Sequence, residues 1–246
     1  MMKAIVKQSV LAVFLVLATA GAGATEDHAP MSNHDHLPLI GAFKVDHLEN
    51  RWQDGRNLLK WEAQGWYGGD TEKIWFNTEG EKVAGEGVGE AEFQLLYSRM
   101  GSEFWDLQAG LRHDIRPHPQ TTYGVLGVKG VAPYFFEVNA QAFISEDGDV
   151  SARLKAEYEL LITQKLILQP ALEVNASAQR VRELENGRGL TDLTLGLRLR
   201  YEIVKEFAPY LGINWDRKLG GTASLARAHG EDPDSLSLVT GLRFWF

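Results

Sequence analysis

The chain has 246 residues, 44% of them hydrophobic, and a formal net charge of −8 at pH 7. Its mean hydropathy of −0.22 is too low for a protein built from membrane-spanning helices, and its acidic balance argues against a polyanionic partner such as nucleic acid. Because the chain has no cysteine, it has no disulfide and no thiolate metal site, so any metal ligands must be His, Met, Asp or Glu.

The N-terminal residues have the three parts of a secretory signal peptide. Lys3 and Lys7 precede an apolar run over Val10–Ala20, which small residues follow up to Ala24. The run has about 11 residues, whereas a membrane-spanning helix needs about 20, so a retained helical anchor is disfavoured. We therefore expect residues 1–24 to be a cleaved signal peptide. Cleavage removes two lysines and no acidic residue, which changes the net charge from −8 to −10.

Residues 25–38 are polar, contain Pro30 and Pro38, and show no hydrophobic period, which predicts a flexible, disordered tail in the periplasm. This tail holds side chains that suit copper, because imidazole and thioether groups are good copper ligands. The candidate metal ligands are His28, Met31, His34 and His36. The alternative is an ordinary short tail with no role in metal binding.

From Leu39 onward, apolar and polar residues alternate with the period of β-strands, most clearly over residues 151–160 and 192–202. We predict twelve extended segments: 41–49, 57–67, 72–78, 89–98, 103–114, 121–130, 134–145, 149–161, 164–177, 191–203, 207–216 and 237–246.

Three features favour a closed membrane barrel over a soluble β-sandwich. Short turns alternate with longer connections, the number of segments is even, and aromatic residues such as Trp66, Trp105 and Tyr134 gather at the short-turn end. We therefore predict an all-β fold over residues 39–246: an antiparallel transmembrane β-barrel of about 12 strands in a Gram-negative outer membrane, with both chain ends in the periplasm. The longer connections are expected at 50–56, 79–88, 115–120, 146–148, 178–190 and 217–236.

The last segment makes the most specific fold prediction. Its alternation places Leu242 on the lipid face and Arg243 in the lumen. If the sheet closes, Phe246 lies beside the start of the first segment, near Phe43.

The expected lumen face carries charges of both signs at strand centres. An excess of carboxylates in a narrow lumen favours cations, so we predict an ion path lined by Glu62, Glu90, Glu92, Asp106, Glu137, Glu157, Glu159 and Glu173. The alternative is an internal ion-pair network that fills and rigidifies the lumen, because paired charges make a narrow polar interior tolerable.

A barrel hydrolase is a further alternative. It would use the neighbouring His113 and Asp114 as a base and its partner. No second feature assembles these residues into a site, so we expect the protein not to be an enzyme.

The chain from Phe43 to Phe246 resembles the copper-resistance protein B family of Gram-negative outer-membrane proteins. The segments that carry the resemblance are Lys60–Asp70, Lys73–Glu81, Leu96–Arg99, Phe104–Gly110, Ala132–Glu137, Ala156–Leu161, Thr163–Pro170, Gly196–Ile203, Glu206–Tyr210 and Gly241–Phe246.

This resemblance implies an outer-membrane barrel that binds or translocates copper ions as part of copper homeostasis, in contact with membrane lipid and beside a periplasmic copper-handling protein. Copper would be a bound or transported ion and not a catalytic cofactor. Family members often carry a longer Met- and His-rich N-terminal segment, so the short tail here puts copper storage by the tail in doubt. The alternative function is a structural or small-solute barrel without metal specificity.

Overall fold

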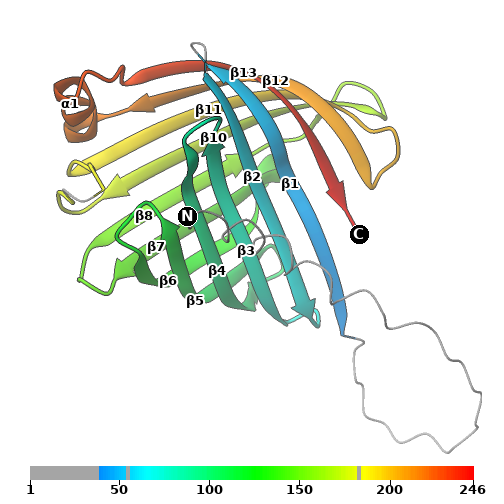
Figure 1. Ribbon diagram of the computed structural model, residues 1–246. Coiled ribbons are helices and arrows are strands. Elements are labelled where there is room, and N and C mark those ends of the chain that lie inside the picture. Colours follow the sequence, from blue (N-terminus) through cyan, green and yellow to red (C-terminus); the bar gives the residue numbers. More distant parts are fainter. Residues whose placement is uncertain (1–38, 54–55, 182–183) are drawn as a thin grey trace, which may run out of the picture. The chain divides into compact units, whose positions relative to one another are not determined.

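The computed structural model describes residues 39–53, 56–181 and 184–246. The expected signal peptide, residues 1–24, and the expected tail, residues 25–38, lie outside this part of the chain. The described residues form one antiparallel sheet that closes on itself (Figure 1). Its strands are β1 (Ile40–Gln53), β2 (Arg56–Gly68), β3 (Glu72–Val83), β4 (Gly87–Ser102), β5 (Trp105–Arg116), β6 (Thr121–Ala132), β7 (Phe136–Ser145), β8 (Val150–Glu157), β9 (Leu160–Leu161), β10 (Leu166–Ser177), β11 (Gly189–Tyr201), β12 (Phe207–Lys218) and β13 (Asp234–Trp245).

Strands that follow one another along the chain pair with one another, and β13 pairs with β1 to close the barrel. The short β9 pairs with β10 in line with β8, so β8 and β9 form one wall strand that is interrupted at Tyr158 and Glu159. Over the described residues the wall therefore has twelve strands, which confirms the prediction. A closed wall satisfies the backbone hydrogen bonds of every strand, as the interior of a lipid bilayer requires.

The closing contact is also confirmed. Phe246 donates its backbone N–H to the Phe43 carbonyl at 3.0 Å and accepts the Phe43 N–H at 2.9 Å. The two phenyl rings lie 5.3 Å apart between centroids. Arg243 points into the lumen, where its Nη1 lies 2.7 Å from the Glu159 carboxylate, and Leu242 is exposed on the outer face.

The two faces of the wall follow the sequence alternation. Leu107, Leu126 and Leu211 on the outer face are more than half exposed, as apolar side chains that meet lipid must be. On β8, Arg153 and Lys155 point inward with side chains that are only 14% and 17% exposed. Charged residues such as Arg153 and Lys155 therefore lie inside the barrel, and the exposed leucines lie outside it.

Exposed aromatic residues lie at the end of the barrel that carries the short turns. They include Phe104, Trp245 and two residues of the 3-10 turn η1 (Pro133–Phe135), namely Tyr134 and Phe135. Aromatic rings prefer this membrane–water boundary. Trp66 also lies at this end, near the last residue of β2, and its ring packs at 6.4 Å between centroids against Trp75, which contacts the apolar cluster inside the lumen.

Two of the expected long connections are much shorter than predicted. Strands β1 and β2 continue to Gln53 and Arg56, and β3 and β4 continue to Val83 and Gly87. Beyond the bilayer a strand needs no apolar outer face, so backbone pairing extends these hairpins although the hydrophobic alternation fades. The prediction of loops at 50–56 and 79–88 was wrong for this reason.

The connection between β12 and β13 contains one helix, α1 (Gly220–Ala228), which the sequence analysis did not predict. It buries Thr222, Ala223 and Ala226, and the Thr222 hydroxyl accepts the backbone N–H of Gly187 at 2.9 Å. This contact joins the two longest connections of the barrel. No helix in the described residues is long and apolar enough to cross a membrane.

Candidate ion path through the barrel lumen

Of the predicted site residues, His28, Met31, His34 and His36 lie outside the described part of the chain. The eight predicted lumen carboxylates all lie on wall positions that face inward. Six of them contact a basic residue or histidine: Glu62, Glu92, Asp106, Glu157, Glu159 and Glu173. Glu90 and Glu137 have no ion pair with another described residue. The expected ion-pair network and the expected excess of carboxylates thus occur together.

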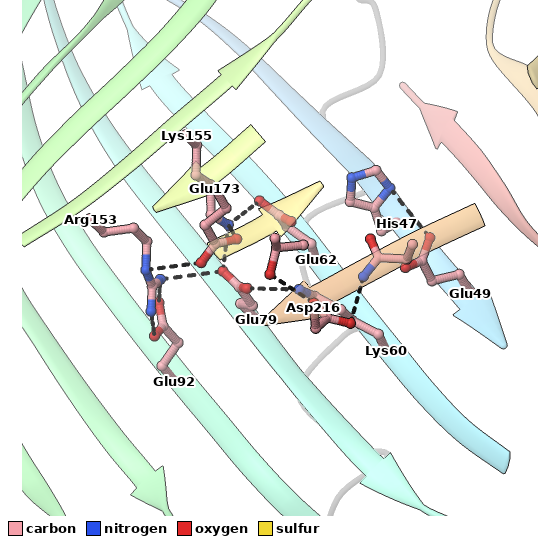
Figure 2. Close-up of polar contacts among 12 residues, drawn as sticks. His47, Glu49, Lys60, Glu62, Glu79, Glu92, Arg153, Lys155, Glu173 and Asp216 are labelled. Carbon is pink, nitrogen blue, oxygen red and sulfur yellow. Dashed lines mark hydrogen bonds and ion pairs between the residues drawn. The ribbon is translucent and has the colours of Figure 1, made fainter. Parts of the chain in front are cut away.

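A cluster of charges joins opposite walls at the middle of the lumen, and we call it the cross-lumen cluster: Lys60, Glu62, Glu79, Glu92, Arg153, Lys155 and Glu173 (Figure 2). Lys155 of β8 binds Glu62 of β2 at 2.8 Å and Glu79 of β3 at 2.7 Å. Arg153 binds both oxygens of Glu92 on β4 at 3.0 and 3.1 Å. These contacts hold β8 against the opposite side of the barrel.

Glu79, which was not among the predicted lumen residues, contacts three basic residues of this cluster. It contacts Lys60 at 3.3 Å, Arg153 at 3.4 Å and Lys155 at 2.7 Å. It was placed in a loop because β3 was expected to end at residue 78. The signal was present, since Glu79 continues the inward alternation of Trp75 and Asn77.

A second cluster surrounds Glu49 of β1, whose side chain is completely buried. Arg51 contacts one of its oxygens at 2.6 Å, and Arg198 of β11 binds both oxygens at 3.1 Å. Tyr210 of β12 donates its hydroxyl to Glu49 at 3.0 Å. Two guanidinium groups and a phenol fully occupy this carboxylate, so Glu49 is a structural anchor of the wall and not a free cation ligand.

His47 lies next to Glu49 and is 5% exposed. Figure 2 shows its ring pointing toward Glu49 within the lumen. The predicted segment 41–49 would place His47 near the end of a strand. Since β1 runs to Gln53, His47 lies at mid-strand.

At the short-turn end, Glu159 contacts Arg200 at 2.9 Å and Arg243 at 2.7 Å. A pocket of about 270 Å³ opens here, lined by Glu159, Arg200, Glu202, Lys205, Ala208, Arg243 and Trp245. On the other side of the lumen, an apolar cluster of Leu96, Tyr123, Val125 and Phe143 fills space between β4 and β7. Ion pairs and apolar side chains together narrow the lumen of the barrel.

Four inward-facing carboxylates have no ion pair with another described residue. Glu81 and Glu90 lie directly opposite each other on β3 and β4, near the end with the longer connections. Asp192 lies at the same end of β11, and Glu137 lies at the short-turn end of β7. Carboxyl groups without an ion pair therefore lie at both ends of a largely neutralised middle, and Lys129 of β6, an inward lysine without an ion pair among the described residues, lies near Glu137 at the short-turn end.

Three comparisons identify relatives of this chain. A family model described as copper resistance protein B precursor (CopB) matches residues 39–246. The chain belongs to this family. It is 44% identical over 202 residues to copper resistance protein B of Escherichia coli, an alignment that covers 82% of this chain and 68% of that protein. It is 43% identical over 221 residues to the copper resistance protein B homolog of Pseudomonas syringae pv. tomato, covering 89% and 74%.

Among solved structures, the NanC porin superposes with a TM-score of 0.55 at 11% sequence identity and covers 82% of this chain and 98% of its own. At this identity the likeness shows the fold alone. Family and fold together make this copper resistance protein B relative an outer-membrane barrel of the Gram-negative type that is linked to copper resistance.

The hydrolase alternative finds no support in the geometry of this copper-resistance barrel. His113 is exposed and its ring contacts Thr122 at 3.0 Å. Asp114 is buried and accepts two hydrogen bonds from Arg112 at 2.7 and 2.8 Å. The two side chains point to opposite faces of β5, so they do not form the expected pair.

Within the residues that the structure describes, no group of three or more His, Asp or Glu side chains is arranged to hold a metal ion. Glu62, Glu79 and Glu173 converge on the Lys155 ammonium, at 2.8, 2.7 and 3.8 Å, so a lysine already occupies that point, and the other lumen carboxylates are spread along the wall. This arrangement suits weak, successive contacts along a path, because an ion that is conducted must also leave each position.

Proposed function

We propose that this copper-resistance barrel binds copper ions and passes them across the outer membrane through its lumen, as part of copper homeostasis. The observation that carries the proposal is that carboxyl groups without an ion pair, which give a negative field when ionised, lie at both ends of the lumen in a chain of the copper resistance protein B family: Glu81, Glu90, Asp192 and Glu137. A field of this sign attracts cations and repels anions.

The predicted tail ligands complete the proposal on the periplasmic side. His28, Met31, His34 and His36 provide imidazole and thioether groups that exchange copper readily. The tail captures copper ions in the periplasm and delivers them to, or accepts them from, a periplasmic copper-handling protein. In this proposal copper is cargo.

One observation favours the second candidate, a structural or small-solute barrel without metal specificity. The cross-lumen cluster and the apolar cluster around Phe143 occupy much of the interior. A barrel filled in this way is rigid, and it need not conduct a particular ion. This candidate predicts the same low passage for copper, zinc and calcium ions.

Deletion of the gene is expected to change both copper tolerance and total cell copper in a host that depends on it. The matched variant keeps the full chain and replaces the tail ligands by His28→Gln, Met31→Leu, His34→Gln and His36→Gln. Because the carboxylates of the lumen remain, this variant is expected to show a smaller change in the same direction as the deletion. Growth in graded copper and metal analysis of washed cells provide the measurement, with graded zinc as the control.

If the deletion strain matches the parent in both copper tolerance and cell copper, the copper function is refuted. If the tail variant matches the parent while the deletion does not, the barrel functions without the tail ligands.

A further inference from the structure

Strand β1 contains a β-bulge in the middle of the lumen wall. Its register with β2 shifts between Val45 and His47, and its register with β13 shifts between Val45 and Leu48. A bulge adds one residue to a strand and re-aims the side chains beside it. As a result, the consecutive Asp46 and His47 both point inward, where Asp46 contacts Lys44 at 2.6 Å. In a regular strand, two consecutive side chains point to opposite faces.

His47 is the buried histidine of the described barrel, since His113, His118 and His229 are exposed. Its Nδ1 lies 3.4 Å from the Tyr210 hydroxyl, which itself donates to Glu49 at 3.0 Å. The Glu49 carboxylate, which two arginines hold, only accepts hydrogen bonds, so the Tyr210 hydroxyl donates its proton to Glu49. The oxygen of the same hydroxyl can then accept a hydrogen bond from Nδ1–H of His47. This relay favours the tautomer of His47 with the ring proton on Nδ1, in which the lone pair is on Nε2.

The relay depends on a glycine in the neighbouring strand. A Cβ atom at Gly241 of β13 would stand 2.5 Å from the hydroxyl oxygen of Tyr210. The absence of a side chain there lets the phenol lie along the wall and reach Glu49. The orientation of His47 is therefore built by three strands: β1, β12 and β13.

The free nitrogen of His47 faces a second carboxylate. Its Nε2 lies 3.8 Å from Oε1 of Glu157 on β8. The other oxygen of Glu157 accepts a hydrogen bond from Gln169 at 2.6 Å, which fixes the carboxylate. A separation of 3.8 Å is too long for a hydrogen bond. It matches two metal–ligand bonds of about 2.0 Å that meet at a wide angle on one ion.

We propose that His47 Nε2 and Glu157 form a transit site for a divalent copper ion in the middle of the lumen, and this inference rests on the proposed passage of copper. One imidazole and one carboxylate favour Cu(II) over Cu(I), which prefers thioether and thiolate ligands, and over calcium or magnesium, which prefer oxygen ligands alone. Carboxylate-assisted orientation of the far ring nitrogen is the usual support of a metal-binding histidine. With two protein ligands and water in the remaining positions, the ion binds weakly enough to leave.

The test uses the full mature chain with the four tail substitutions, so that copper binding by the tail does not obscure the lumen. One equivalent of Cu(II) is added to the protein in detergent micelles, and pulsed electron paramagnetic resonance detects the remote nitrogen of a copper-bound imidazole. The expected signal shows one imidazole. The signal is lost in His47→Gln and retained in the rim control His113→Gln. In Glu157→Gln the apparent affinity for copper falls about tenfold.

The inference is overturned if the parent protein shows no imidazole signal, or if the signal is unchanged in His47→Gln. If His47 and Glu157 form a purely structural pair, the parent protein shows no imidazole signal. Each variant is checked for a folded barrel by its heat-dependent mobility on gels. Copper flux without an imidazole signal would refute this site but not the proposed function. An imidazole signal without copper flux would refute the proposed function but not copper binding at this site.

Discussion

The Arg153→Gln variant is expected to lose about 3–5 kcal/mol of barrel stability, because removal of one partner leaves buried charges without compensation. Arg153 contacts Glu79 at 3.4 Å, Glu92 at 3.0 Å and Glu173 at 3.5 Å. Its side chain is 14% exposed, so water replaces these contacts poorly. Unfolding by urea in phospholipid vesicles, followed by tryptophan fluorescence, measures the loss.

Arg217→Gln is the matched control for this experiment. Arg217 pairs with Asp234 at 3.5 Å, but both side chains are nearly half exposed. An exposed pair contributes about 0–1 kcal/mol, so this variant should unfold almost like the parent. If the Arg153 variant also stays within about 1 kcal/mol of the parent, the cross-lumen cluster does not stabilise the barrel.

The second large effect is expected on the outer face. Leu126 lies at the middle of β6, is 62% exposed and points away from the lumen. An arginine at the bilayer midplane of a barrel costs about 2–4 kcal/mol. Leu126→Arg should therefore lower the unfolding free energy in vesicles by this amount, and it should unfold at lower urea concentration than the parent.

Asp70→Arg adds the same side chain in the exposed turn between β2 and β3, outside the bilayer, and should change stability little. Equal stabilities of the Leu126 and Asp70 variants would contradict the placement of the leucine face in lipid. The pair of variants separates the effect of depth in the membrane from the effect of an added positive charge.

Most of the barrel could be predicted from the sequence because a strand repeats every two residues and each wall strand has one apolar face. Leu154 and Arg153 face opposite sides for this reason, and the position of Phe246 beside Phe43 follows from closure of the sheet. The period weakens where the strands leave the bilayer, which is why the ends of β3 and β4 were predicted too short.

The partners inside the lumen could not be predicted in the same way. Alternation assigns Glu62 and Lys155 to the inner face, but it does not say that they meet across 93 residues of sequence. That contact depends on strand register and on the width of the barrel. The bulge at Asp46 and His47 interrupts the alternation itself, so the orientation of His47 follows only from the three-dimensional pairing of β1 with β2 and β13.

The most direct test of copper passage is ion flux through the reconstituted full chain. Liposomes containing the protein and a trapped metal-sensitive dye, calibrated for each ion, are exposed to equal concentrations of copper, zinc or calcium ions. We predict that copper enters protein-containing liposomes faster than protein-free ones, and faster than zinc or calcium. Copper entry no faster than in protein-free liposomes, or equal entry of all three ions, would contradict this prediction.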